Sequence, residues 1–124
     1  MKGGGYNMFL AKYNTSGEVL WVKQASSPGG NVYPAADIAV DETGNSYVTG
    51  SFISNNGTAT FGNTTLNNAG APNFSLFVAK YDSAGNLLWV RQVDSASGTG
   101  VALDSVCNSY VTGYFYGTAT FGNA

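Results

Sequence analysis

The chain has 124 residues, of which 44% are hydrophobic and 10% are charged, and its formal net charge is −2. This length and apolar content suit one folded domain and argue against intrinsic disorder. The five Lys and Arg residues are scattered, so we expect no basic surface for nucleic acid. No apolar run approaches the roughly 20 residues of a membrane helix, so membrane insertion is not expected, and the opening residues lack the apolar core of a signal peptide.

The first pattern along the chain returns later in it. The sequence FLAKYNTSGEVLWVKQ at residues 9–24 recurs as FVAKYDSAGNLLWVRQ at residues 77–92. Next, IAVDETGNSYVTGSF at residues 38–52 recurs as VALDSVCNSYVTGYF at residues 101–115, and GTATFGN at residues 57–63 recurs at residues 117–123. The repeat units span about residues 3–68 and 69–124. Such a period indicates repeated units that bury their apolar faces against one another.

The recurring segments are short, rich in aromatic and β-branched residues, and bounded by Gly, Asn, Asp and Ser. This composition predicts strands throughout and no helix of useful length. Within residues 77–81, Phe77, Ala79 and Tyr81 fall on one face of a strand, and Val78 and Lys80 fall on the other. This alternation is typical of a strand covered on at least one face. The runs at residues 19–22 and 87–90 do not alternate, which predicts that both of their faces are largely buried.

A recurrent turn joins these strands. Residues 14–17, 41–44 and 82–85 each start with Asn or Asp and end with Gly, which predicts a type I turn followed by a bulge. In the fourth instance, residues 104–107, Cys107 replaces Gly, and a side chain in the left-handed conformation costs about 1 kcal/mol. Calcium loops are an alternative interpretation of the Asp-x-x-Gly turns. Calcium requires about six to eight oxygen ligands, and each turn supplies one Asp, so plain hairpins are favoured.

The longer connections are expected to lie together on one face, opposite the tight turns. They are residues 25–35, 53–75, 93–99 and the tail after Tyr116. Within the second connection, residues 59–61 and 64–66 around Gly62-Asn63 predict a small additional hairpin. Because all variation in length between the copies falls on these connections, we expect any ligand to bind at this rim.

Together, these motifs resemble the bacterial β-propeller repeat family known as SBBP, in two copies that cover nearly the whole chain. The resemblance implies an all-β fold made of propeller blades of four antiparallel strands, with about two blades in the chain. One whole blade, at about residues 36–92, would be flanked by two half blades in a single repeat domain, 1–124. Members are usually exported or displayed at the bacterial surface, so an extracellular or cell-surface location is expected.

Propellers close with about four to eight blades, and two blades leave apolar faces and strand edges open. Closure therefore requires either oligomerisation or further blades of a longer chain. Both ends of the chain lie at the same phase of the repeat, so the inner pair of one copy is expected to complete a blade with the outer pair of the next. We hypothesise head-to-tail self-association of three or four copies.

The candidate ligand rim contains amide, aromatic and carboxylate side chains. Its residues are Asn31, Tyr33, Asp37, Asn55, Asn56, Tyr114 and Tyr116. Such side chains stack on sugars or hydrogen-bond to peptides, although packing between blades and solubility alone also account for them. Asp37 is of interest because its counterpart is Gly100, so the repeat itself does not require a carboxylate there. It is interpreted either as a ligand for a cation or a sugar hydroxyl, or as a solvated residue at the end of a loop.

Enzyme chemistry has little support in the sequence. The chain has no His, which is the commonest general base and zinc ligand, and nothing is expected to activate Cys107. We therefore expect no catalytic, cofactor-binding or metal-binding residues. The favoured function is a non-catalytic propeller module that binds glycan or protein. The alternatives are a propeller-type polysaccharide hydrolase or lyase with acids supplied by additional blades, and a truncated repeat without a function of its own.

Overall fold

The computed structural model describes residues 5–33, 35–54, 57–68 and 73–122, so Asn55 and Asn56 lie outside the described residues. Within these ranges eleven strands form antiparallel sheets. The strands are β1 (Met8–Tyr13), β2 (Val19–Ser26), β3 (Gly30–Val32), β4 (Asp37–Val40), β5 (Ser46–Ser54), β6 (Thr58–Phe61), β7 (Thr64–Asn67), β8 (Ser75–Tyr81), β9 (Leu87–Asp94), β10 (Ala96–Leu103) and β11 (Ser109–Phe115). No helix in the described part of the chain is long and apolar enough to span a membrane. The predicted all-β fold is confirmed.

The middle sheet is a blade of four antiparallel strands in the order β4-β5-β8-β9. Its register places Val48 opposite Ala79, and Ala79 opposite Val90. The short strand β3 pairs with the far end of β5, on the same side as β4. The blade architecture expected from the sequence is therefore present.

A second sheet has the order β1-β2-β6-β7. The additional hairpin predicted at residues 59–61 and 64–66 is confirmed as β6 and β7. It does not stand alone, because Ala25 of β2 pairs with Phe61 of β6. The hairpin therefore widens the sheet formed by β1 and β2.

In the third sheet, β10 pairs with β11. The sequence predicted a loop at residues 93–99, and this prediction was wrong: β9 continues to Asp94 and β10 begins at Ala96. Ser95 makes the change of direction in one residue by adopting a positive φ of 59°. A non-Gly residue at such a corner gives no compositional signal, so the strand was mistaken for a loop.

The four tight turns have the predicted geometry. The N–H of the fourth residue donates to the carbonyl of the first at 3.0 Å in each, at Gly17, Gly44, Gly85 and Cys107. All four fourth residues have positive φ, which is 85° at Gly44 and 65° at Cys107. Cys107 thus adopts the conformation that Gly adopts in the other three turns.

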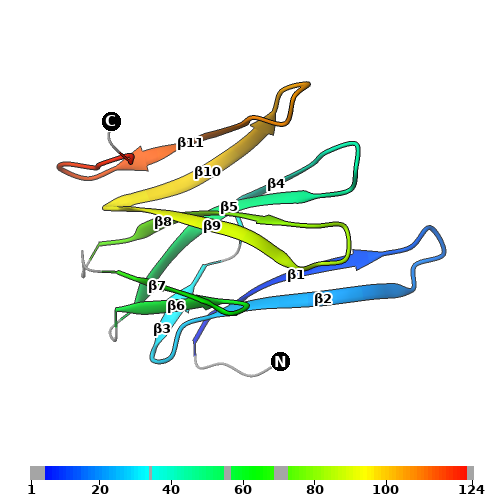
Figure 1. Ribbon diagram of the computed structural model, residues 1–124. Coiled ribbons are helices and arrows are strands. Elements are labelled where there is room, and N and C mark those ends of the chain that lie inside the picture. Colours follow the sequence, from blue (N-terminus) through cyan, green and yellow to red (C-terminus); the bar gives the residue numbers. More distant parts are fainter. Residues whose placement is uncertain (1–4, 34, 55–56, 69–72, 123–124) are drawn as a thin grey trace.

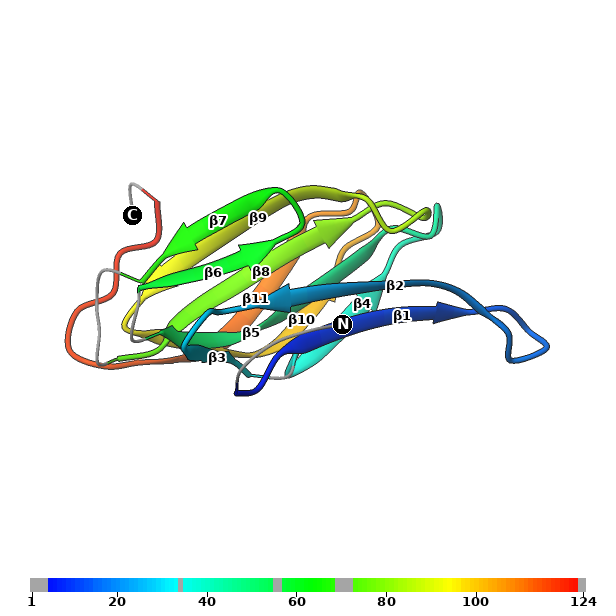
Figure 2. The ribbon, with the colours of Figure 1, turned by 90° about the horizontal axis from the view of Figure 1, so that it is seen from below.

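The sheets are stacked in the order of the chain (Figure 1), with β1 and β2 at one side, the middle blade in between, and β10 and β11 at the other side. The tight hairpin turns of the stacked strand pairs project toward one end of the molecule, and most of the longer connections gather at the opposite end. Figure 2 shows the small hairpin β6–β7 beside the middle blade. This arrangement matches the expected separation of tight turns from the long-connection rim.

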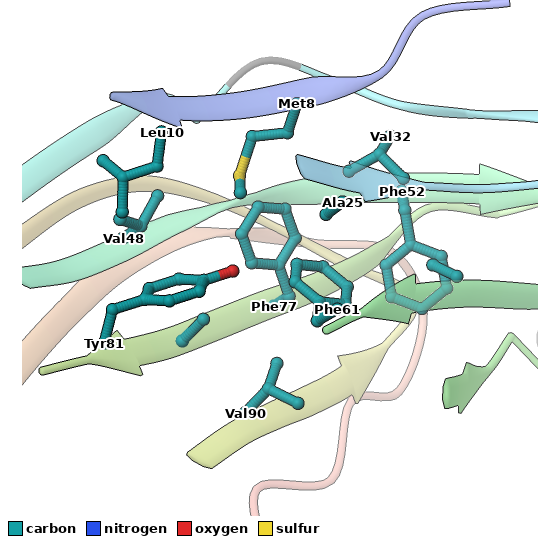
Figure 3. Close-up of a cluster of buried hydrophobic side chains, with 12 residues drawn as sticks. Met8, Leu10, Ala25, Val32, Val48, Phe52, Phe61, Phe77, Tyr81 and Val90 are labelled. Atoms are coloured by element: carbon teal, nitrogen blue, oxygen red, sulfur yellow. The ribbon is translucent and has the colours of Figure 1, made fainter. Parts of the chain in front are cut away.

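The main core lies between the first sheet and the middle blade (Figure 3). Met8, Leu10, Ala25 and Phe61 from one side meet Phe77 and other buried side chains of the blade. The predicted burial of both faces at residues 19–22 was wrong, because Val19, Leu20 and Val22 are exposed. Val22 lies on the side of its sheet that has no neighbour within the described residues, since its counterpart Val90 is buried, whereas Leu20 is exposed in both copies, because its counterpart Leu88 is also exposed.

Candidate ligand-binding rim

Three aromatic side chains from separate parts of the chain meet at the long-connection end. Tyr6 precedes β1, Tyr33 follows β3, and Phe74 precedes β8. The rings of Tyr6 and Tyr33 are stacked, with centroids 6.0 Å apart and an interplanar angle of 26°. The ring of Phe74 packs edge-on against that of Tyr33, with the ring centroids 5.3 Å apart. Because Tyr6 is 66% exposed, this cluster presents an aromatic surface to solvent.

Backbone hydrogen bonds hold the cluster in place. The N–H of Tyr6 donates to Oδ1 of Asn31 at 2.8 Å, and the N–H of Val32 donates to the carbonyl of Tyr6 at 2.8 Å. The N–H of Tyr33 donates to the carbonyl of Ser51 at 2.9 Å, which ties its backbone to β5. Asn31 therefore positions Tyr6 rather than standing alone as a ligand group.

A second aromatic pair lies at the end of β11. The rings of Tyr114 and Tyr116 are perpendicular, with centroids 5.8 Å apart. The N–H of Tyr116 donates to the carbonyl of Ser95 at 2.8 Å, which anchors the chain after β11 to the corner between β9 and β10. Both tyrosines are exposed.

Asp37 begins the innermost strand, and its carboxylate contacts the neighbouring sheet. Oδ2 accepts a hydrogen bond from the N–H of Val101 at 2.9 Å, and Oδ1 accepts one from Ile38 at 2.9 Å. The first of these bonds joins β4 to β10. Asp37 is thus a link between adjacent inner strands, a role that the alternatives drawn from the sequence did not include.

At the opposite end, the inner turns of the two repeats flank a groove that includes Asp41, Glu42 and Asp104. Desolvation acts to raise the pKa of Asp41, but hydrogen bonds from Asn45 and Thr43 outweigh it and lower that pKa to about 2. The side-chain amide of Asn108 similarly lowers the pKa of Asp104. These carboxylates accept hydrogen bonds within their own turns. No cluster of three or more His, Cys, Asp or Glu residues suited to a metal ion occurs within the described residues.

The structure thus brings Asn31 and Tyr33 together and places Tyr114 beside Tyr116, while Asp37 lies between the inner strands. Sequence reasoning missed Tyr6 and Phe74. Both lie within two residues of the start of an outer strand, and in an antiparallel blade that start lies at the same end as the close of β5. That topological position was the signal that would have identified them.

A family comparison agrees with this geometry. The model of the SBBP beta-propeller repeat matches residues 20–57, which run from β2 to the end of the connection after β5. The chain contains an SBBP beta-propeller repeat. The assignment of a second SBBP unit rests on the internal likeness of residues 77–123 to the first copy. No curated protein matches the chain.

Proposed function

We propose that this chain is a non-catalytic β-propeller module that binds neutral carbohydrate through its long-connection rim. The observation that carries the proposal is the stacked cluster of Tyr6, Tyr33 and Phe74. Aromatic faces offer a large apolar surface with polar tips, which suits the alternating apolar and hydroxyl faces of a sugar ring. In the proposal, the exposed Tyr6 ring makes the first contact.

The chemistry of the rim favours carbohydrate over a charged ligand. Tyr6, Tyr33, Tyr114 and Tyr116 supply hydroxyl groups and rings, and the side chain of Asn31 is a neutral amide. A protein ligand is a separate possibility that the same experiment distinguishes. By analogy with the family, we place this activity outside the bacterial cell or at its surface.

The test is binding of the full chain to an array of neutral glycans, followed by titration of the best glycan. Tyr6→Ala is expected to weaken binding about tenfold or more, as removal of a central aromatic contact commonly does. Tyr6→Phe keeps the ring and is expected to retain most of the affinity. Because the Tyr6 side chain is exposed, neither change should unfold the chain.

Val106→Ala is the matched control, since Val106 is an exposed apolar residue in a tight turn at the opposite end. Its affinity should equal that of the unmodified chain. Equal losses for Tyr6→Ala and Val106→Ala would contradict a rim site. Release of reducing ends from the bound glycan would contradict a non-catalytic role, and binding to proteins without any glycan binding would contradict the choice of ligand.

A further inference from the structure

The exposed apolar residues at the two sides of the stack are repeat counterparts of residues that are buried in the core. Phe77 is fully buried against the first sheet, and a Cβ added at Gly50 would lie only 3.0 Å from its ring. The counterpart of Phe77 is Phe9, which is 64% exposed on the outer face of β1. The counterpart of Gly50 is Gly113 in β11. The same ring and glycine therefore occur a second time, on opposite sides of the molecule.

Other positions of the main core also have counterparts in a second, smaller cluster. A small cluster of Leu76, Val93, Ala96 and Ala119 repeats the positions of Met8, Ala25, Val32 and Ala59 in the main core. The equivalence of Ala96 to Val32 is structural, since their N–H groups donate to the carbonyls of Phe74 and Tyr6, which are themselves counterparts. This small cluster therefore forms one side of a second core, and no residues within the described part of the chain pack against it as the middle blade packs against the main core.

Exposure values support the same conclusion at the aromatic positions. Phe52 and Phe61 are fully buried, whereas their counterparts Phe115 and Phe121 are 59% and 51% exposed. Phe115 and Phe121 line a groove together with Leu76, Ala96, Val111 and Gly113. This groove occupies the place that corresponds to the Phe77 site in the main core.

Leu20 and Leu88 differ from Phe9, because their exposure does not result from a missing neighbour. They are counterparts, and they are 55% and 52% exposed respectively. A position that is exposed in both repeats faces solvent in a complete blade. A position that is buried in one repeat and exposed in the other, such as Phe9, lacks a neighbour.

We propose that a second copy of this chain occupies the groove, with its β1 pairing antiparallel to β11. Each copy has the exposed face of β1 with Phe9 on one side and the groove on the other. The β1 face of one copy can therefore cover the groove of the next, and no other partner is required. The register follows from the pairing of β5 with β8. It places Val111 opposite Ala11, Tyr110 opposite Lys12, and Gly113 opposite Phe9 of the next copy. The sheet β10-β11 then continues through β1 and β2 of that copy into a four-stranded blade.

Charge and hydrogen-bonding groups fit this arrangement. Within the chain, Nζ of Lys80 lies 4.9 Å from the centre of the Tyr47 ring, and Tyr110 with Lys12 of the next copy repeats this pair. Nε1–H of Trp21 donates to the carbonyl of Ser83 at 3.1 Å across the main interface. The counterpart bond runs from Trp89 to Thr15 of the next copy.

The same register extends the rim. One position beyond the paired strands, Tyr116 lies opposite Tyr6 of the next copy. The pair Tyr114–Tyr116 then adjoins the cluster of Tyr6, Tyr33 and Phe74 at each junction. The interface itself does not depend on which ligand the rim binds. With two blades in each copy, three or four copies close a ring of six or eight blades.

Engineered disulfides test the register in a Cys107→Gly background. The pairs Ala11→Cys with Val111→Cys and Lys12→Cys with Tyr110→Cys occupy adjacent register positions. Directly opposed residues alternate between hydrogen-bonded and non-hydrogen-bonded sites about 5.5 and 4.5 Å apart, and both separations suit a disulfide. We expect covalent multimers from at least one pair under oxidation. Ala11→Cys with Tyr114→Cys is out of register and should give none, and multimers from that pair alone would overturn the proposal.

Surface variants test the apolar contact independently. Phe9→Ser changes a side chain that is exposed within one copy, so the circular dichroism of the strands should persist while the sedimenting species shifts to 12.9 kDa. Leu20→Ser is the matched control, and it should sediment like the unmodified chain. If Phe9→Ser sediments as the unmodified chain does, the proposed interface is wrong.

Discussion

The carboxylate of Asp37 accepts a hydrogen bond from the main-chain N–H of Val101, 2.9 Å away and 64 residues further along the chain. This bond joins the innermost strands of two successive sheets, β4 and β10. Since the second repeat has Gly100 at the position of Asp37, such a link occurs at one of the two equivalent positions in the chain.

Asp37→Ala is expected to destabilise the chain by about 1–2 kcal/mol, because it leaves the amide of Val101 without its acceptor. Chemical unfolding measures the loss, and hydrogen exchange at the Val101 amide should become faster. Asp37→Asn keeps an acceptor oxygen and should lose less. Equal exchange rates at Val101 in the Ala variant and the unmodified chain would contradict the link.

Cys107→Gly is expected to stabilise the chain by about 1 kcal/mol. Cys107 has a φ of 65°, in the left-handed region that disfavours side chains and that Gly occupies without cost. Cys107→Ala is the control, since it removes the thiol and keeps the Cβ. Thermal or urea unfolding of both variants separates the two effects, and equal stability of the Gly and Ala variants would rule out backbone strain as the cause.

Acid should destabilise the turns through Asp41, Asp82 and Asp104. Hydrogen bonds lower all three pKa values, that of Asp41 from 3.8 to about 2. Because folding lowers these values, their stabilisation is fully present above about pH 4 and is lost as the pH falls toward 2.

The triple variant Asp41→Asn, Asp82→Asn, Asp104→Asn removes this titration while keeping an acceptor in each turn. The chain already contains such a turn, in which Oδ1 of Asn14 accepts hydrogen bonds from Ser16 and Glu18. Unfolding free energy measured from pH 6 to pH 2 should fall less steeply in the variant. An unchanged slope would show that other groups govern acid unfolding.

Tyr81→Phe is expected to leave the stability unchanged or to raise it by about 1 kcal/mol. The hydroxyl of Tyr81 is buried in the main core and has no hydrogen-bond partner within the described residues. Burial also raises the pKa of Tyr81 to about 12, so its contribution to stability is present below pH 10 and is lost as the pH rises toward 12. The variant should therefore resist alkaline unfolding better, and a loss of more than about 1 kcal/mol at neutral pH would indicate a bound partner for the hydroxyl.

Much of the fold could be predicted because each pattern of strand and turn residues occurs twice in the sequence. Gly44 and Gly85 identify the turns, and the resemblance to the SBBP repeat implies the order β4-β5-β8-β9 that the structure has. The corner at Ser95 could not be predicted, because a single residue with positive φ leaves no compositional trace. The pairing of Ala25 with Phe61 was also missed, because it joins distant segments and depends on how the sheets are stacked.

The candidate rim was only partly predictable for a related reason. Tyr33 and Asn31 lie in a connection whose length differs between the copies, which marks them as candidates, whereas Tyr6 and Phe74 lie just before regular strands. The bond between Asp37 and Val101 depends on the neighbouring sheet, so no local pattern indicates it. Contacts between blades thus account for most of what the sequence did not reveal.

The mass of the native species tests the central claim most directly, namely that the repeat forms propeller blades whose apolar sides are completed by further copies. Light scattering after size-exclusion chromatography should give three or four times 12.9 kDa over a wide range of concentrations. A mass of 12.9 kDa at all concentrations, together with a cooperative thermal transition, would contradict the claim.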